Sequence, residues 1–217
     1  MAMNNKDNMT ERIDDALKQL ISLSPQRKFI ESVDLCIKVG IDPRQTNQKV
    51  KGNTLLPYGH GKRHDVALFT NKGQRDIELP DKYTIQSGGQ ELVEIVSKQK
   101  FSLVLSTEDG LKHVSVLSRQ LGSKGLMPTT KNGTVLADDS DLSQKVADIT
   151  KNYVQFKNDS SSFIHLPIGT LTMSQDHLTA NILHVLQELQ TLKPKQSKGK
   201  FIRRIQISTS MGSCVQV

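Results

Sequence analysis

The chain of 217 residues has no tryptophan, only 4% aromatic residues and two cysteines. With so few aromatic rings, a platform on which unpaired bases stack is not expected. Cys36 and Cys214 lie in strand-like contexts without metal-ligand spacing. We interpret them as reduced packing residues, which suits a reducing compartment. No apolar run is long enough to span a membrane, and the first residues have the features neither of a signal peptide nor of a transit peptide.

Motifs that carry catalysis are also missing. The sequence has no G-x-S-x-G, no C-x-x-C and no convincing pair of carboxylates. The segment 59–62 lacks the length and the hydroxyl residue of a phosphate-binding loop. His60 and His64 are four residues apart in a glycine-containing segment, which is a poor setting for a metal site. We therefore expect no enzymatic activity, no cofactor and no metal. The rival interpretation, a small α/β enzyme with a basic nucleotide-binding cleft, needs motifs that are absent.

Positive charge is in excess and is unevenly distributed. The formal net charge is +7 and the pI is near 9.4, which favours a polyanionic partner. Residues 58–152 hold 13 basic and 12 acidic residues, a net charge of +1, whereas the two ends together hold 16 and 10, a net charge of +6. If the ends fold together, the basic surface belongs to one domain.

The two ends of the chain have the patterns of an α+β domain. Apolar residues alternate with polar ones where strands are expected and recur at helical spacing elsewhere. Thr10 is a candidate helix cap, and Pro25 and Pro194 follow the expected helix ends. The expected elements are a helix after Thr10, a strand at 33–39, a strand at 163–166, a helix at 178–192 and a last strand from 202.

The middle of the chain alternates between strand and helix patterns, which is typical of a small α/β unit with a parallel sheet. The expected elements there are strands at 66–70, 83–85 and 101–105 and helices at 90–98, 111–121 and 142–150. We predict an α+β sheet domain from residues 1–57 and 153–217, with an inserted Rossmann-like α/β domain at 58–152. The hinge between them is expected at Gly59, Gly61 and Asn152.

The last eighteen residues carry the strongest signal of function. Residues 202–209 alternate as in a half-buried strand, with one mostly apolar face and one face that offers Arg204, Gln206 and Ser208. The segment Thr209–Gly212 follows with two hydroxyls, a thioether and a glycine. Hydroxyls can bond phosphate or ribose oxygens, and a methionine fits a curved apolar surface. From this chemistry alone the turn is either an RNA contact or an ordinary strand end.

A basic run precedes that strand. From Lys193 to Arg204 the sequence contains lysines and arginines and no acid. Such a run can neutralise phosphate charge, although a solvated loop is the commoner outcome for basic runs in general. Its position directly before the turn in the sequence favours RNA binding.

The turn resembles the C-terminal signature of the L-one family of large-subunit ribosomal proteins, whose members carry Ser/Thr-Thr-Met-Gly at this point. Further segments resemble successive blocks of the family over nearly the whole chain. They are residues 29–34 (FIESVD), 40–44 (GIDPR), 56–62 (LPYGHGK), 125–128 (GLMP) with 133–135, and 156–159 (FKND) with 164–165. The loop at 122–130 departs from the family pattern, which bears on the inserted domain more than on the RNA site.

The resemblance also implies which residues bind RNA. It assigns a contact to Phe29, which by itself would be taken for a core residue, and it gives Asp159 the role of orienting a neighbour. The expected RNA-binding residues are Lys28, Phe29, Ser32, Lys157, Asp159, Lys198, Lys200, Arg204, Ser208, Thr209, Ser210, Met211 and Gly212. A secondary contact with rRNA or tRNA is expected from a loop of the middle domain containing Gly125, Leu126, Met127 and Pro128.

By resemblance, the chain is expected to be a structural constituent of the large ribosomal subunit. It would bind the mobile stalk of large-subunit rRNA near the E site as a monomer, and it would assist the release of deacylated tRNA. It would also repress its own mRNA, because that messenger mimics the rRNA site. The expected location is the ribosome, in the cytoplasm or in an organelle, and no membrane partner is expected. A free regulatory RNA-binding protein outside the ribosome is the alternative.

Overall fold

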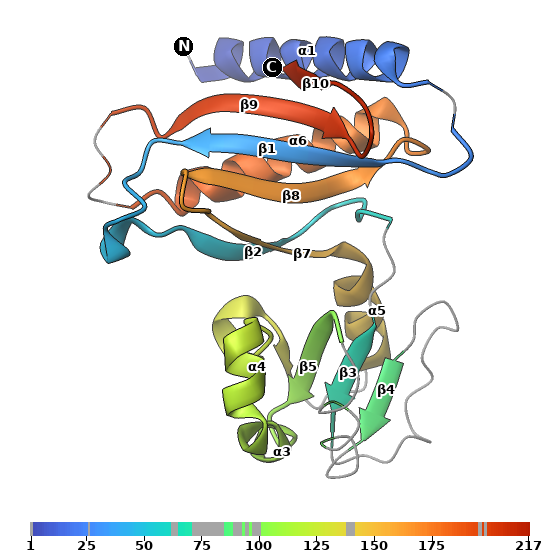
Figure 1. Ribbon diagram of the computed structural model, residues 1–217. Coiled ribbons are helices and arrows are strands. Elements are labelled where there is room, and N and C mark those ends of the chain that lie inside the picture. Colours follow the sequence, from blue (N-terminus) through green and yellow to red (C-terminus); the bar gives the residue numbers. More distant parts are fainter. Residues whose placement is uncertain are drawn as a thin grey trace. The chain divides into compact units, whose positions relative to one another are not determined.

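The computed structural model describes residues 2–25, 27–61, 65–70, 85–88, 93, 96, 101–137, 142–194, 197 and 199–217 (Figure 1). The chain divides into two compact units. The first unit consists of Met1–Gly61 and Asn152–Val217, and the second of Lys62–Lys151. Both ends of the chain therefore belong to the same unit.

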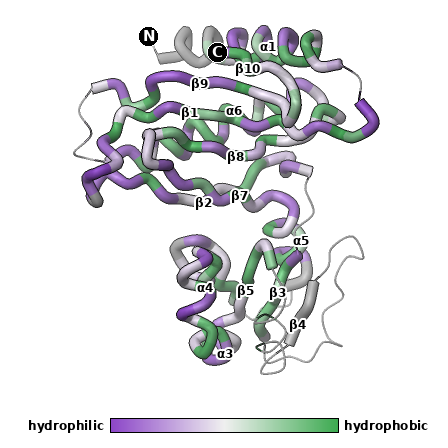
Figure 2. Tube along the Cα trace, viewed as in Figure 1, coloured by the Kyte–Doolittle hydropathy of each residue, from purple (hydrophilic) through white to green (hydrophobic). Residues whose placement is uncertain are grey.

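The described part of the first unit is built on a four-stranded antiparallel sheet with the order β10-β9-β1-β8. The apolar residues of the central strand β1 are almost fully buried at every second position, which is the alternation expected from the sequence (Figure 2). The strands are β1 (Ser32–Val39), β8 (Phe163–Thr170), β9 (Ile202–Thr209) and β10 (Cys214–Gln216). The three predicted strands are confirmed, and β8 continues beyond its predicted end at residue 166.

Two helices pack on one side of this sheet (Figure 1). They are α1 (Ala2–Leu23) and α6 (Gln175–Thr191). Their apolar stripes join the sheet residues in one core, in which Leu17 and Ile182 are fully buried. The prediction that Thr10 caps the first helix is wrong, because α1 begins at Ala2 and Thr10 lies inside it. The residues before Thr10 include neither proline nor glycine, so nothing in them stops the helix.

A second, two-stranded antiparallel sheet joins β2 (Lys51–Leu55) to β7 (Tyr153–Lys157). The sequence analysis missed β2, because its residues do not alternate between apolar and polar types. At Gly52 an added Cβ would lie 2.8 Å from Leu192 and 2.9 Å from Phe156, so no side chain fits there. This sheet brings the two chain segments that connect to the second unit side by side.

The second unit contains the parallel sheet that was predicted, with the order β4-β3-β5-β6. Its elements are β3 (Val66–Phe69), β4 (Ile85–Gly88), β5 (Leu103–Thr107), β6 (Val135–Leu136), α3 (Leu111–Val116), α4 (Ser118–Lys124) and α5 (Leu142–Asn152). The helix predicted at 111–121 is in fact two short helices that meet at Leu117. The strand β5 begins two residues later than predicted, and of the strand predicted at 83–85 only Ile85, the first residue of β4, is described. The helix predicted at 90–98 lies outside the described residues, apart from helical Val93 and Val96.

Candidate nucleic-acid interface

The described helices of the first unit leave the other face of its main sheet uncovered (Figure 1). We call this face the open face. Successive side chains of a strand point to opposite sides, so the partly exposed positions of β1, β8 and β9 share it. The register pairs Asp34 with Ser208, Cys36 with Gln206 and Lys38 with Arg204. The residues of the open face are Ser32, Asp34, Cys36, Lys38, Phe163, His165, Arg204, Gln206 and Ser208.

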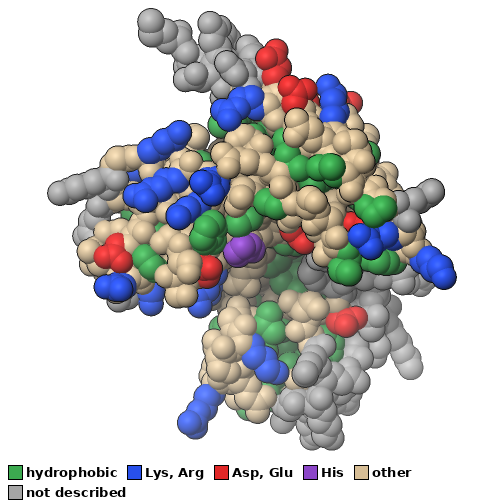
Figure 3. Space-filling view, turned by 45° about the horizontal axis from the view of Figure 1, so that its top comes forward, with side chains coloured by type: hydrophobic (Ala, Val, Ile, Leu, Met, Phe, Trp, Pro, Cys, Tyr) green, Lys and Arg blue, Asp and Glu red, His purple; other side chains and the backbone are tan. Residues whose placement is uncertain are grey.

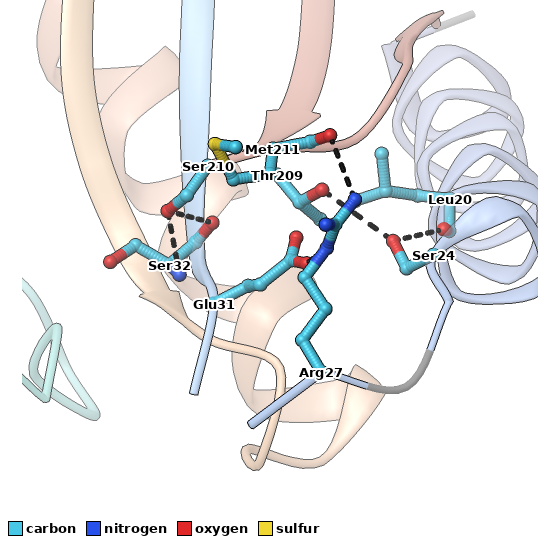
Figure 4. Close-up of polar contacts among 8 residues, drawn as sticks. All are labelled: Leu20, Ser24, Arg27, Glu31, Ser32, Thr209, Ser210 and Met211. Carbon is cyan, nitrogen blue, oxygen red and sulfur yellow. Dashed lines mark hydrogen bonds and ion pairs between the residues drawn. The ribbon is translucent and has the colours of Figure 1, made fainter. Parts of the chain in front are cut away.

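At one end of the open face, the Thr209–Gly212 turn lies against residues 27–32 (Figure 4). The backbone N–H of Ser32 donates to Oγ of Ser210 at 3.1 Å, and the N–H of Ser210 donates to the Ser32 carbonyl at 3.1 Å. Nη2 of Arg27 donates to the Met211 carbonyl at 3.2 Å. The turn and the segment 27–32, which the sequence analysis linked to RNA binding separately, are therefore joined by hydrogen bonds.

An almost fully buried carboxylate lies beneath the turn (Figure 4). Glu31 is only 2% exposed and forms an ion pair with Arg27. The pKa of Glu31 is lowered, first by the hydrogen bond from the Thr209 side chain and then by the positive charge of Arg27, while burial opposes both. Glu31 is therefore ionised at neutral pH and holds both partners in place. The sequence analysis missed Arg27 and Glu31, although an arginine and a glutamate four residues apart are a recognisable pairing signal.

The four residues of the turn divide into two pairs. Thr209 is buried, and its Oγ1 lies 3.5 Å from Oγ of Ser24. At Gly212 an added Cβ would lie 2.1 Å from Oγ1 of Thr209, so the turn closes only with a glycine there. Ser210 is exposed, and Met211 is 65% exposed. Thr209 and Gly212 therefore shape the turn, whereas Ser210 and Met211 face outward.

Phe29 is 52% exposed, so it is not a core residue. With Ile21 and Ile30 it lines a shallow hollow of about 490 Å³, next to Arg27 and Glu31. Lys28 is exposed in the same segment. The contact role that the resemblance gave to Phe29 stays a prediction.

The two basic residues of the open face, Lys38 and Arg204, lie at the end away from the turn. Arg204 and Lys38 are register partners there, and Nζ of Lys38 lies 5.3 Å from the ring centre of Phe163. Lys200 is exposed just before β9. Because a strand rises about 3.4 Å per residue, the eight residues of β9 separate this end from the turn by roughly 25 Å. The basic run and the turn, which are close in the sequence, are therefore separated in space by the length of β9.

The segment after β7 is also at this basic end. Oδ1 of Asp159 accepts hydrogen bonds from the N–H groups of Ser161 and Phe163 at 2.9 and 2.7 Å. Asp159 thus orders the turn into β8, in line with the role expected for it. Lys157 is exposed in β7, opposite Lys51 of β2. Lys198 lies outside the described residues.

The two thiols do not behave alike. Cys36 is partly buried in the middle of the open face, and burial, followed by the nearby Cys214 and Asp159, raises the pKa of its thiol. Cys36 is therefore protonated at neutral pH. Cys214 in β10 is exposed, so the interpretation of both cysteines as packing residues is wrong for Cys214.

The stretch 125–128 of the second unit packs inward. Gly125 ends α4 with φ of +72°, and the N–H of Leu126 donates to the Leu121 carbonyl at 2.9 Å, as in a Schellman motif. Leu126 and Met127 pack against the core of this unit, and Pro128 is buried. The stretch 125–128 follows α4 outside any helix or strand, so the expected loop is present, and its secondary contact with rRNA or tRNA stays a prediction.

The expected hinge residues are anchored within the first unit. Gly59 and Gly61 have φ of +69° and +73°, which favours glycine. The carbonyl of Gly59 accepts a hydrogen bond from Nδ2 of Asn181 at 2.9 Å. The carbonyl of Asn152 accepts one from the N–H of Leu56, also at 2.9 Å. A hinge at these positions stays a prediction.

Within the described ranges, no three His, Cys, Asp or Glu side chains are grouped so that they could bind a metal ion. Among the described helices, none has both the length and the hydropathy of a membrane-spanning segment.

A polar sheet face with cations at one end is suited to binding nucleic acid through its phosphate backbone. The sequence model of the ribosomal protein L1p/L10e family matches residues 17–213, and the chain belongs to this family. Membership makes it a large-subunit ribosomal protein that binds rRNA and is not an enzyme.

Several bacterial relatives share most of their length with this chain. Each is described as large ribosomal subunit protein uL1. The protein from Pasteurella multocida is 37% identical over 196 residues, which are 88% of this chain and 82% of the relative. The protein from Kosmotoga olearia is 33% identical over 207 residues, 94% of this chain and 87% of the relative. The protein from Desulfosudis oleivorans is 33% identical over 214 residues, which are 98% of this chain and 88% of the relative.

Proposed function

We propose that the open face and the Thr209–Gly212 turn bind the mobile stalk of large-subunit rRNA near the E site, with the protein present as a monomer in the ribosome. The observation that carries this proposal is the turn itself. Arg27 and Ser32 hold its backbone, while Met211 projects into solvent. An exposed methionine fixed on a rigid support is suited to a curved apolar surface such as a ribose or a base edge.

Ser210 is suited to a direct contact with RNA. Its Oγ accepts the N–H of Ser32 at 3.1 Å, whereas its distance to the Ser32 carbonyl is 3.5 Å, which is long for an O–H donor. The hydroxyl proton is therefore available for a phosphate or ribose oxygen. Ser32 and Ser208 offer further hydroxyls on the open face, and Lys28, Lys38 and Arg204 supply charge that neutralises phosphate.

Sedimentation tests this function against the alternative of a free regulatory RNA-binding protein. In a lysate at physiological salt, the native protein should sediment with the large subunit, and added stalk rRNA fragment should compete it off. A protein found only in the ribosome-free fractions would favour the alternative. If the protein sediments with the large subunit, its proposed repression of its own mRNA can be tested as well. A reporter preceded by the leader of that mRNA should then be repressed by excess protein.

We also propose that the two compact units are domains that move relative to each other, and that the second assists the release of deacylated tRNA from the E site. The unequal distribution of charge supports this division, because residues 58–152 carry only +1 of the total +7. Two chain connections join the units, near Gly61 and Asn152. A double connection permits bending and limits free rotation.

Replacing residues 62–151 with a short Gly/Ser linker should weaken binding to the stalk rRNA by less than about tenfold, or ~1.4 kcal/mol. The first unit has its own core, and the hydrogen bond between Leu56 and Asn152 keeps the two cut ends close. Ribosomes that carry the shortened protein should release E-site tRNA slowly. A folded variant that no longer binds the RNA would contradict this division of labour.

A further inference from the structure

A basic groove lies at the end of the first unit where β9 begins, and its volume is about 450 Å³. Five exposed cationic side chains line it: Arg12 of α1, Lys193 after α6, Lys200 before β9, and Arg203 and Arg204 of β9. We call it the edge groove. In Figure 3, Lys and Arg side chains gather at one end of the same unit.

The edge groove holds more positive than negative charge, since the terminal carboxylate of Val217 is the only acidic group among its described lining residues. Its lining includes no aspartate or glutamate, and none of the five cations makes an ion pair with a described residue. The walls contain nearly buried apolar side chains, among them Leu186, Phe201 and Ile205. A hollow with charges of one sign and walls of low dielectric constant concentrates the electrostatic field and attracts counterions. The groove therefore favours an anion.

The position of the groove indicates which anion. β10 pairs only with Gln206–Ser208, so the first residues of β9 form the edge of the sheet among the described strands. Arg204 belongs both to the open face and to the edge groove. A chain of phosphates that leaves the open face at its basic end thus reaches the groove past Arg204. Two guanidinium groups on adjacent residues can each bind a phosphate through two N–H groups.

We propose that the edge groove binds a second phosphodiester segment of the same RNA, so that the RNA continues from the open face around the edge of β9 towards α1. This proposal rests on the proposed function, because it requires RNA on the open face. Arg12 and Lys193 are suited to a test of the groove, since they belong neither to the open face nor to the turn and are not among the RNA-binding residues expected from the sequence.

The double variant Arg12→Gln/Lys193→Gln tests the groove. For the wild type, about five neutralised phosphates give a plot of log K against log salt with a slope of roughly −4. The variant should bind a stalk rRNA fragment about tenfold or more weakly in low salt, with a slope shallower by roughly 2. The control Lys112→Gln/Arg119→Gln removes one lysine and one arginine from exposed positions of the second unit and should leave both quantities unchanged.

A second measurement needs no substitution. Acylation of lysines in the full-length protein should be slowed at Lys193 by bound RNA, while Lys18, exposed on another part of α1, should react as before.

These measurements separate a failure of the edge groove from a failure of the proposed function. A wild-type protein that does not bind the fragment would overturn the proposed function as well. Wild-type binding with an unchanged slope in the Arg12/Lys193 variant, and with no protection of Lys193, would overturn the edge groove alone. If the variant instead lost only the ability to bind polyglutamate, the groove would belong to an acidic polypeptide, and the RNA proposal would be wrong.

Discussion

Met211→Ala should weaken binding to the stalk rRNA by about 1–3 kcal/mol, or roughly five- to 150-fold. The side chain is 65% exposed in the free protein, so its burial against RNA would be gained only on binding. Truncation also leaves a gap at the interface. For the same reason the thermal midpoint of the free protein should change little. Equilibrium binding and thermal unfolding of the same preparation measure both effects.

Val116→Ala is a matched control, since Val116 is 73% exposed on α3 in the other unit. It should leave the affinity for RNA unchanged. Ser210→Ala is a less direct probe than Met211→Ala, because Oγ of Ser210 also accepts the N–H of Ser32. If Met211→Ala folds normally and binds as the wild type does, the turn is only the end of a strand.

Asn181→Ala should lower the free energy of unfolding by about 3 kcal/mol, because it removes one buried amide that satisfies three backbone groups. Nδ2 of Asn181 donates to the carbonyls of Gly59 and Ile168, both at 2.9 Å, and Oδ1 accepts the N–H of Tyr58 at 3.1 Å. Thermal unfolding should show a midpoint lower by about 10 °C.

Gln187→Ala removes an exposed amide from the same helix and should be nearly neutral. The folded Asn181→Ala protein should bind RNA almost as the wild type does, because Asn181 lies in the core and not on the open face. A midpoint equal to that of the wild type would show that solvent or other groups satisfy the released backbone positions.

Some of this architecture is visible in the sequence because it depends on local periodicity. The alternation of β1 and β9 predicts which side chains are buried, and hence which of them form the open face. In the second unit β3 is apolar throughout and β5 is largely so, which made the parallel arrangement of these two strands predictable as well. In these segments the polarity and spacing of the residues are enough to predict which side chains are buried.

Other features depend on partners that are remote in sequence. The short strand β2 has little pattern of its own and exists because β7 pairs with it. The burial of Thr209 depends on Glu31 and Ser24, which come from the other end of the chain. The basic run adjoins the turn in the sequence but is separated from it by the length of β9. Local patterns carry no information about such distances.

The strand order of the first unit has a consequence for synthesis of the protein. β1 lies between β8 and β9, so neither of its edges is paired before synthesis reaches the last quarter of the chain. Ser32 and Ser210, which hydrogen-bond to each other, are 178 residues apart. At roughly 5–20 residues per second, a new chain waits on the order of ten to thirty seconds for this contact. An unfinished chain therefore lacks part of the proposed RNA site, and on this proposal it should compete poorly for rRNA.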